Sequence, residues 1–297
     1  MTKRKKRRTT AYKKRSSTIL RTVKRFIVGL SATIAFLSGL LFLFNCYFPT
    51  GNRQTAESTV GTIAEGVEIP TLKNDRRGQI IDHEGFIISY NADYRIANWA
   101  AYELTAEEVK SRHVKRTNKF IPDPKVKGAT AVDSDYRRSG YDRGHLVPAG
   151  DMRWSQEGMD ASFYFSNICP QNRGLNAGLW NDIEKQCRKW ATKYGAIFIV
   201  TGPVIDGNMQ RLGKNKVGIP NMFYKVVCSH TGGEYRSIGF LVENRNYADR
   251  SLEDVAVPVD SIESVTGIDF FPSFPEEIQS KMESSINRKH WALSKLN

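Results

Sequence analysis

Apolar residues form one long uninterrupted run near the start of the chain and many shorter runs after residue 76. The long run, 26–44, holds 19 residues without a charge, close to the ~20 apolar residues that a helix needs to cross a bilayer. The shorter runs have the length of strands and are separated by turn residues. The pattern therefore predicts a membrane helix followed by a domain of mixed secondary structure.

The short apolar runs predict a sheet with several helices around it. Residues 80–81 and 86–88 flank Asp82-His83-Glu84-Gly85, which is typical of a β-hairpin. Further strands are predicted at 96–104, 196–200, 223–228 and 237–242, and a helix start with acidic residues in its first turn at 105–108. Helices are predicted at 178–194, 253–266 and 275–293. We interpret the chain as an α+β domain whose central helix lies between antiparallel sheets.

The net charge of +13 is concentrated in the first residues. Residues 1–25 contain 12 of the 44 basic side chains and no acidic one, which leaves 32 basic against 31 acidic side chains downstream. Basic residues beside a membrane helix stay on the cytoplasmic side. We therefore predict a basic cytoplasmic tail at 1–25, a transmembrane anchor at 26–48, a polar linker at 49–75 and a domain at 76–297, outside the cytoplasm.

A cleaved signal peptide or an organelle presequence is the alternative for the N-terminal segment. The apolar part of a signal peptide has about 7–15 residues and ends in a small-residue cleavage site. Here the run is longer, and residues 44–48 offer no such site. We favour an uncleaved anchor, which makes the chain a single-pass membrane protein with its C-terminal domain in the periplasm or outside the cell.

The cysteines leave their own pairing open. Three of the four, Cys169, Cys187 and Cys228, lie in the predicted exported domain, which permits one disulfide and one leftover thiol. No pair has the spacing of a zinc site.

The candidate chemistry lies between residues 142 and 188. Phosphodiester hydrolysis needs a base that deprotonates water, and imidazole titrates near neutral pH. His145 is preceded by Arg143, a phosphate-binding type of side chain, and by Gly144, which permits close approach of the backbone. A single histidine is more often structural, and we interpret the other four in that way: His83, His113, His230 and His290.

Asn176, Glu184 and Arg188 each have an ordinary and a functional interpretation. Asn176 can cap a helix, or its amide oxygen can bind Mg²⁺, a cation that prefers oxygen ligands and keeps several waters. The two roles are compatible. Glu184 and Arg188 are four residues apart, so they form either a surface pair or a functional pair on one helix face. On a regular helix Asn176 and Glu184 lie about 80° apart around the axis.

The ordered set of these residues resembles a known family. It consists of Asp142-Arg143-Gly144-His145-Leu146-Val147-Pro148-Ala149-Gly150-Asp151-Met152, then Asn167, Pro170-Gln171, Asn176, Trp180, Glu184 and Arg188. The set resembles the DNA/RNA non-specific endonucleases, the sugar-non-specific ββα-metal nucleases that include mitochondrial endonuclease G. The resemblance extends from about residue 78 to 271. It implies the ββα-metal (His-Me finger) fold, here preceded by one transmembrane helix.

The same resemblance implies a role for each candidate residue. His145 would be the general base and Asn176 the direct ligand of Mg²⁺, which Mn²⁺ can replace in our expectation. Glu184 would order the water shell of the ion. Arg143 and Arg188 would bind the phosphate, and Arg116 would be a further phosphate contact. Asn167 would support the site.

We therefore predict a Mg²⁺-dependent endonuclease that hydrolyses DNA and RNA, leaves 5′-phosphate ends and is tethered to a membrane. The alternative is a catalytically inactive, membrane-bound nucleic-acid-binding protein on the same scaffold. A zinc hydrolase is disfavoured because no second histidine has ligand spacing from His145. The biological role, the preference for DNA or RNA and the oligomeric state, including a homodimer, stay open.

Overall fold

The computed structural model describes residues 66–73, 78–247 and 250–293. The chain divides into two units, 1–59 and 60–297, and all described residues belong to the second. The predicted basic tail and anchor lie outside the described residues. Within the described ranges, no helix is both long and apolar enough to cross a membrane.

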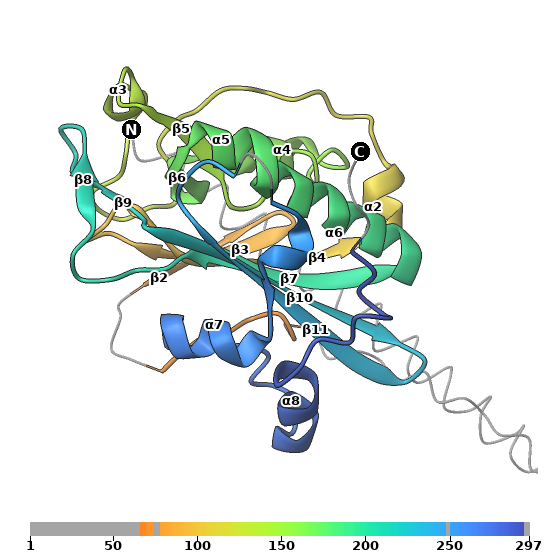
Figure 1. Ribbon diagram of the computed structural model, residues 1–297. Helices are drawn as coiled ribbons and strands as arrows, with labels where there is room; N and C mark the ends of the chain where they lie inside the picture. Colours follow the sequence, from red (N-terminus) through yellow and green to blue (C-terminus); the bar gives the residue numbers. More distant parts are fainter. Residues whose placement is uncertain (1–65, 74–77, 248–249, 294–297) are drawn as a thin grey trace, which may run out of the picture. The chain divides into compact units, whose positions relative to one another are not determined.

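A seven-stranded sheet with antiparallel neighbours forms the centre of the unit (Figure 1). Its order is β12-β11-β10-β7-β4-β3-β2. The predicted hairpin is confirmed, because Ile81 pairs with Ile88 across it. The strands are β2 (Gln79–His83), β3 (Phe86–Asn91), β4 (Ile96–Thr105), β7 (Ala196–Pro203), β10 (Met222–Thr231), β11 (Glu234–Glu243) and β12 (Ala256–Val257).

Each face of this sheet has its own hydrophobic core. Successive side chains of a strand point to opposite faces. In β7, Ile199 belongs to one core and Val200 to the other, and in β10 Val227 and Val226 divide in the same way. The near-continuous apolar runs that predicted these strands are therefore explained by burial on both faces.

The motif-bearing elements cover one face. β5 (Tyr141–His145) and β6 (Ile168–Asn172) form a separate two-stranded antiparallel sheet. The chain then continues through α5 (Arg173–Leu175) and a π-helical turn η2 (Asn176–Trp180) into α6 (Asn181–Tyr194). Figure 1 shows α6 lying along the large sheet, with β5 and β6 beside it. Smaller elements near this face are α2 (Ala106–Lys110), α3 (Asp133–Tyr136), α4 (Gln156–Ser162), η1 (Phe165–Asn167), β8 (Gln210–Leu212) and β9 (Val217–Ile219).

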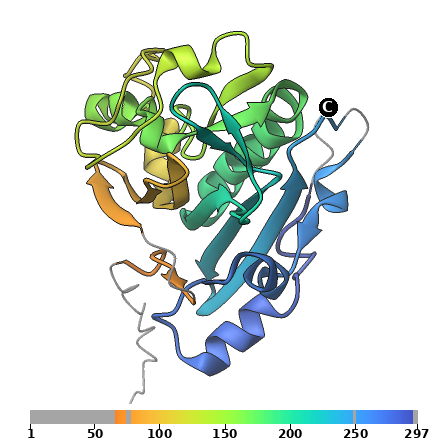
Figure 2. The same ribbon diagram turned by 90° about the vertical axis from the view of Figure 1, so that its left-hand side faces the viewer.

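Two C-terminal helices and a short strand pair cover the other face (Figure 2). They are α7 (Val259–Thr266), α8 (Glu276–Glu283), β1 (Thr71–Leu72) and β13 (Ile268–Asp269). The predicted helices 253–266 and 275–293 are too long. Pro258 is the N-cap of α7, since proline is tolerated at a helix start and breaks a helix interior. The residues before it form η3 (Leu252–Asp254) and β12 instead of a helix. The helix α8 ends at Glu283.

The folded unit starts before residue 76, the predicted end of the linker. Val67 is buried in the core, and Leu72 of β1 pairs with Ile268 of β13. The three cysteines of the unit are all buried and free, so no disulfide forms among Cys169, Cys187 and Cys228. The predicted helix start at Thr105 is confirmed as a capping box with Glu108. The mixed α/β prediction holds, whereas the transmembrane helix finds no support in the described part of the chain.

Candidate active site

The hairpin of β5 and β6 holds the motif in place through close backbone contact. Gly144 faces Cys169 in the pairing, and a Cβ atom at Gly144 would lie only 2.3 Å from the Gln171 Oε1 atom. Asn167 then fixes the chain beyond the strand: its Oδ1 accepts from the Val147 amide at 3.0 Å and its Nδ2 donates to the Val147 carbonyl at 2.9 Å. Asn167 thus supports the segment that follows His145 without itself reaching an open surface, because it is fully buried.

His145 ends β5 in a largely apolar environment. The rings of Phe163 and Phe120 approach it edge-on, at centroid distances of 4.9 and 5.6 Å. Burial lowers the pKa of His145 to about 3, and the charge of Arg116 acts in the same direction, against a hydrogen bond to the Arg143 backbone. The Nε2 atom is buried and has no hydrogen-bond partner among the described residues. The imidazole is therefore neutral at physiological pH, with one ring nitrogen available to accept a proton.

Two arginines flank this imidazole on the same aromatic rings. The Arg143 guanidinium lies 5.2 Å from the centroid of Phe120 and forms an ion pair with Asp133 at 2.6 Å. The Arg116 guanidinium lies 4.9 Å from the centroid of Phe163. Cation–π contacts of this kind hold a guanidinium in place and leave its N–H groups able to bind an anion. The aromatic side chains around His145 thus also place positive charge beside it.

Asn176 occupies a distorted turn and not the helix cap that its position suggested. The cap is Asn172, whose Oδ1 accepts from the Gly174 amide at 2.9 Å. Asn176 begins the π-helical turn, in which Gly178 has non-helical angles of φ −101° and ψ −113°. The simple helical-wheel angle between Asn176 and Glu184 therefore does not apply. Such π-turns are frequent at functional sites.

The π-helical turn is attached to β5 at two points. The Asn176 Nδ2 atom donates to the Asp142 carboxylate at 3.0 Å, which directs the amide and leaves its oxygen as the remaining polar atom. The indole of Trp180 donates to the carbonyl of His145 at 3.2 Å. Strand β5 therefore anchors both the predicted base and the predicted metal ligand.

Helix α6 contributes a carboxylate and a guanidinium. Arg188 forms an ion pair with Asp151 at 2.6 Å, and the other oxygen of Asp151 accepts from the Tyr102 hydroxyl at 2.9 Å. Gly150 lies close beside this pair, since a Cβ atom there would come within 3.1 Å of the Arg188 Nη1 atom. The guanidinium is thus held on the side of α6 that faces the end of the motif.

Glu184 lies in a field of mixed charge. Burial raises the pKa of Glu184 to about 7, while the charge of Lys225 lowers it and that of Asp151 raises it further. Arg116 interacts electrostatically with both Glu184 and His145, so that one guanidinium lies within range of the acid and of the imidazole. The predicted residues of the hairpin and of α6 therefore share one electrostatic environment.

The oxygen atoms near the π-helical turn suit a hard divalent cation. Mg²⁺ prefers oxygen ligands and is often held by one or two protein groups, with water completing its coordination. The amide oxygen of Asn176 and the neighbouring carboxylate of Asp142 meet this requirement, and Glu184 can accept hydrogen bonds from bound water. The donor set is therefore compatible with Mg²⁺.

Several residues of the site received no role from the sequence. Asp142 and Asp151 lie within the motif, so their position was a usable signal, although their partners Asn176 and Arg188 come from distant segments. Lys225 is fully buried and donates to the Leu146 carbonyl at 3.3 Å. A lysine in the apolar run 223–228 was the available signal for it.

Two further histidines have structural surroundings, as we interpreted them from the sequence. The Nε2 atom of His83 lies 2.9 Å from the Asp123 carboxylate, and both side chains are buried. His290 lies 2.7 Å from the Ser229 hydroxyl.

The sequence profile of the DNA/RNA non-specific endonucleases matches residues 64–277 of the chain. The chain belongs to this family. The predicted family is thereby confirmed, and with it the assignment of the chain to the nucleases. Individual relatives are similar to it at about one third identity. Human endonuclease G, named as mitochondrial, is 34% identical over 208 residues, which cover 66% of this chain and 70% of the relative.

Two more relatives extend the comparison. The mitochondrial nuclease EXOG of Danio rerio is 34% identical over 206 residues, 64% of this chain and 60% of its own length, so less than two thirds of that relative is matched. The mitochondrial nuclease of Saccharomyces cerevisiae is 31% identical over 228 residues, 69% of each protein. A solved structure, the crystal structure of the EndoG/EndoGI complex, matches with a TM-score of 0.63 and 30% identity, over 67% of this chain and 88% of the solved chain.

The comparisons overturn the predicted localisation. We expected a single-pass membrane protein with a periplasmic or extracellular catalytic domain, but these relatives of the endonuclease family are named as mitochondrial nucleases. The described residues contain no membrane-spanning helix. The predicted topology is therefore wrong on these findings, and a membrane partner is not supported.

Proposed function

We propose that the chain is a Mg²⁺-dependent endonuclease that hydrolyses phosphodiester bonds of both DNA and RNA and leaves 5′-phosphate ends. The observation that carries this proposal is the neutral, buried imidazole of His145, whose unpartnered Nε2 lies beside two arginines and on the strand that anchors Asn176. A base, positive charge and a hard oxygen ligand are the three parts that this hydrolysis requires.

His145 acts as the general base in this proposal. Its Nε2 accepts a proton from a water molecule, whose oxygen attacks phosphorus in line with the departing 3′ oxygen. The bond from phosphorus to that oxygen breaks, so the phosphate stays on the 5′ oxygen of the downstream fragment, and the departing 3′ oxygen takes up a proton from water to become a hydroxyl. The low pKa of His145 in the free protein keeps the imidazole unprotonated before the reaction. As a proton arrives, the negative charge of the phosphate offsets the cost of forming an imidazolium.

The arginines bind and orient the phosphate. Arg143 and Arg116 are held over aromatic rings, and Arg188 is fixed by Asp151, so each presents a positioned cation to non-bridging oxygens. A phosphate bound near Arg143 competes with Asp133 for the guanidinium. Contacts to phosphate carry no base identity, so weak sequence preference follows.

Asn176 would hold Mg²⁺ through its amide oxygen, with Asp142 fixing the amide and Glu184 accepting hydrogen bonds from the ion's waters. When bound, Mg²⁺ would supply positive charge that stabilises the negative charge that develops on the phosphate.

Cleavage by the purified full chain tests the proposal. We expect it to nick and then degrade supercoiled plasmid and single-stranded RNA in Mg²⁺, to stop in EDTA, and to produce ends that a ligase joins without added kinase. An inactive nucleic-acid-binding protein on this scaffold would retard both substrates in a gel without cutting either. That outcome would overturn the proposal.

A further inference from the structure

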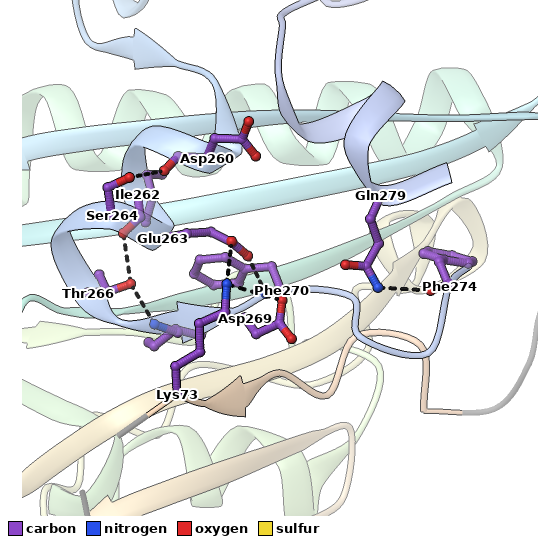
Figure 3. Close-up of polar contacts among 11 residues, drawn as sticks. Lys73, Asp260, Ile262, Glu263, Ser264, Thr266, Asp269, Phe270, Phe274 and Gln279 are labelled. Atoms are coloured by element: carbon purple, nitrogen blue, oxygen red, sulfur yellow. Dashed lines mark hydrogen bonds and ion pairs between the residues drawn. The ribbon is translucent and has the colours of Figure 1, made fainter. Parts of the chain in front are cut away.

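A cluster of carboxylates lies on the sheet face opposite α6. It consists of Asp260 and Glu263 of α7 and Glu283 of α8, and one oxygen of each lies within 4.8 Å of the others. Asp260 and Glu263 are three residues apart and so lie on one side of α7. Figure 3 shows both side chains extending from α7, with Lys73 and Asp269 beside Glu263.

Glu283 differs from the acids of an ordinary surface cluster because its side chain is buried. It is 4% exposed, and its Oε1 atom is buried without a hydrogen-bond partner among the described residues. A buried, unpartnered carboxylate is unfavourable, because the protein supplies nothing to replace the lost water. Because Glu283 is the last residue of α8, it also lies at the negative end of that helix, where cations are favoured over anions.

One basic side chain neutralises part of the cluster, at Glu263, whose other oxygen accepts from the Phe270 amide at 2.8 Å. Lys73 pairs with Glu263 at 2.9 Å and with Asp269 at 3.5 Å. Asp260 and Glu283 form no ion pair within the described ranges. Burial raises the pKa of Glu283 to about 8, and the charges of Glu263 and Asp260 raise it further. The carboxylates therefore repel one another unless a cation or a proton joins them.

We infer that Asp260, Glu263 and Glu283 form a structural binding site for a hard divalent cation of the Ca²⁺ class. Ca²⁺ binds six to eight oxygens at about 2.3–2.6 Å, so opposite ligands lie about 4.6–5.2 Å apart, compatible with the spacing here. Its flexible coordination also accepts water and backbone carbonyls. The ion would join the first turn of α7 to the last residue of α8, two helices that both contact β11. It would stabilise this face without taking part in phosphodiester cleavage.

Calcium titration of the full-length Asn176→Ala variant tests the site, because that substitution removes the proposed catalytic metal ligand from the measurement. After chelation and dialysis, we expect calorimetry with CaCl₂ to show one ion per chain and the melting temperature to rise saturably. Adding Glu283→Gln should weaken calcium binding at least 10-fold. The matched control is Glu276→Gln, an exposed acid in the first turn of the same helix, which should leave binding unchanged.

A second variant covers the case in which Glu283→Gln does not fold. Asp260 is exposed, so Asp260→Asn should fold and should also weaken calcium binding. The inference is overturned if calcium gives neither heat nor a rise in melting temperature. It is equally overturned if calcium binds Asp260→Asn or Glu283→Gln as well as the control. Neither result depends on nuclease activity, so the proposed function can stand while this site falls.

Discussion

The carboxylates on the two faces of the seven-stranded sheet have different neighbours. On the face that carries α6, Asp151 is bound between Arg188 and Tyr102, and Glu184 lies near Lys225. On the face that carries α7 and α8, Glu283 lies near other acids and forms no ion pair within the part of the chain that the structure describes. Both faces bury acidic groups, but on the second face Lys73 pairs with Glu263 and Asp269 and leaves Glu283 without an ion pair among the described residues.

This contrast indicates what each face can bind. The α6 face has two arginines beside a neutral imidazole and a third, Arg188, on α6, an arrangement that attracts a phosphate and leaves a base free to act. On the opposite face, Asp260 and Glu283 are acids that form no ion pair among the described residues. Burial of charge is therefore not a signal of function by itself. The sign of the side-chain charge that a face keeps after its acids and bases have paired indicates whether that face binds an anion or a cation.

The largest expected effect is on the base of the α6 face. His145→Ala should lower the turnover number by about 10²–10⁴-fold, the usual contribution of a positioned general base. The fold should survive, because Nε2 has no hydrogen-bond partner among the described residues and only the bond to the Arg143 backbone is lost. Turnover on plasmid DNA measures the loss of catalysis, and circular dichroism measures whether the fold is retained.

A matched control separates the loss of the base from the effect of replacing any histidine by alanine. His113 is exposed and lies 2.9 Å from the Ser111 hydroxyl, so His113→Ala should retain activity. If the turnover number of His145→Ala is within a few-fold of that of the unmodified chain, His145 is not the general base.

The second effect concerns stability and compares the two faces directly. Asp151→Asn leaves Arg188 without its ionic partner in a partly buried position. Loss of one member of a buried pair costs about 3–5 kcal/mol, and because the Arg188 side chain is 22% exposed we expect about 2–4 kcal/mol. Urea unfolding measures the change, and a free energy of unfolding that is unaltered would show that the pair is unimportant.

The corresponding substitution on the opposite face should have the opposite sign. The folded-state pKa of Glu283 is raised from 4.5 to about 8, so its contribution to stability is present at low pH and is lost as the pH rises through about 8. In EDTA at pH 9, Glu283→Gln should therefore raise the free energy of unfolding, by about 1–3 kcal/mol. Equal destabilisation by Asp151→Asn and Glu283→Gln would remove the difference between the faces.

The smallest effect is a pH dependence on the α6 face. The pKa of Glu184 is raised to about 7, so the carboxylate forms as the pH rises through 7 and should then bind the waters of Mg²⁺. At limiting Mg²⁺, we expect kcat/KM to rise several-fold between pH 6 and 8. Glu184→Gln should flatten this rise, whereas the pKa of His145, about 3, lies below the range. A rise that persists in Glu184→Gln would exclude Glu184 as its cause.

The strands and the motif could be predicted from the sequence because their signals are local. Short apolar runs located β2, β3, β4, β7, β10 and β11, and the acidic residues after Thr105 indicated the helix start there. The ordered motif led to the correct family. Long-range contacts were not visible. The ion pair of Arg188 with Asp151 joins residues 37 positions apart, and nothing in the local pattern marks it.

Two failures have specific physical causes. The helical pattern around Asn176 gave no sign of a π-helical turn, because the distortion depends on how Asn176 and Trp180 attach to β5. The helices near the C-terminus were predicted too long, although Pro258 marked a boundary. The localisation rested on charge and hydropathy at 1–48, outside the described residues, and the named relatives contradict it.

The most direct test of the catalytic account is a Mg²⁺ titration of cleavage by the full chain and by its Asn176→Ala and His145→Ala variants. We predict that Asn176→Ala shifts half-maximal activity to at least 10-fold higher Mg²⁺. His145→Ala should lower the maximal rate at an unchanged Mg²⁺ midpoint. If the Asn176→Ala midpoint equals that of the unmodified chain, the amide does not hold the ion and the account is contradicted.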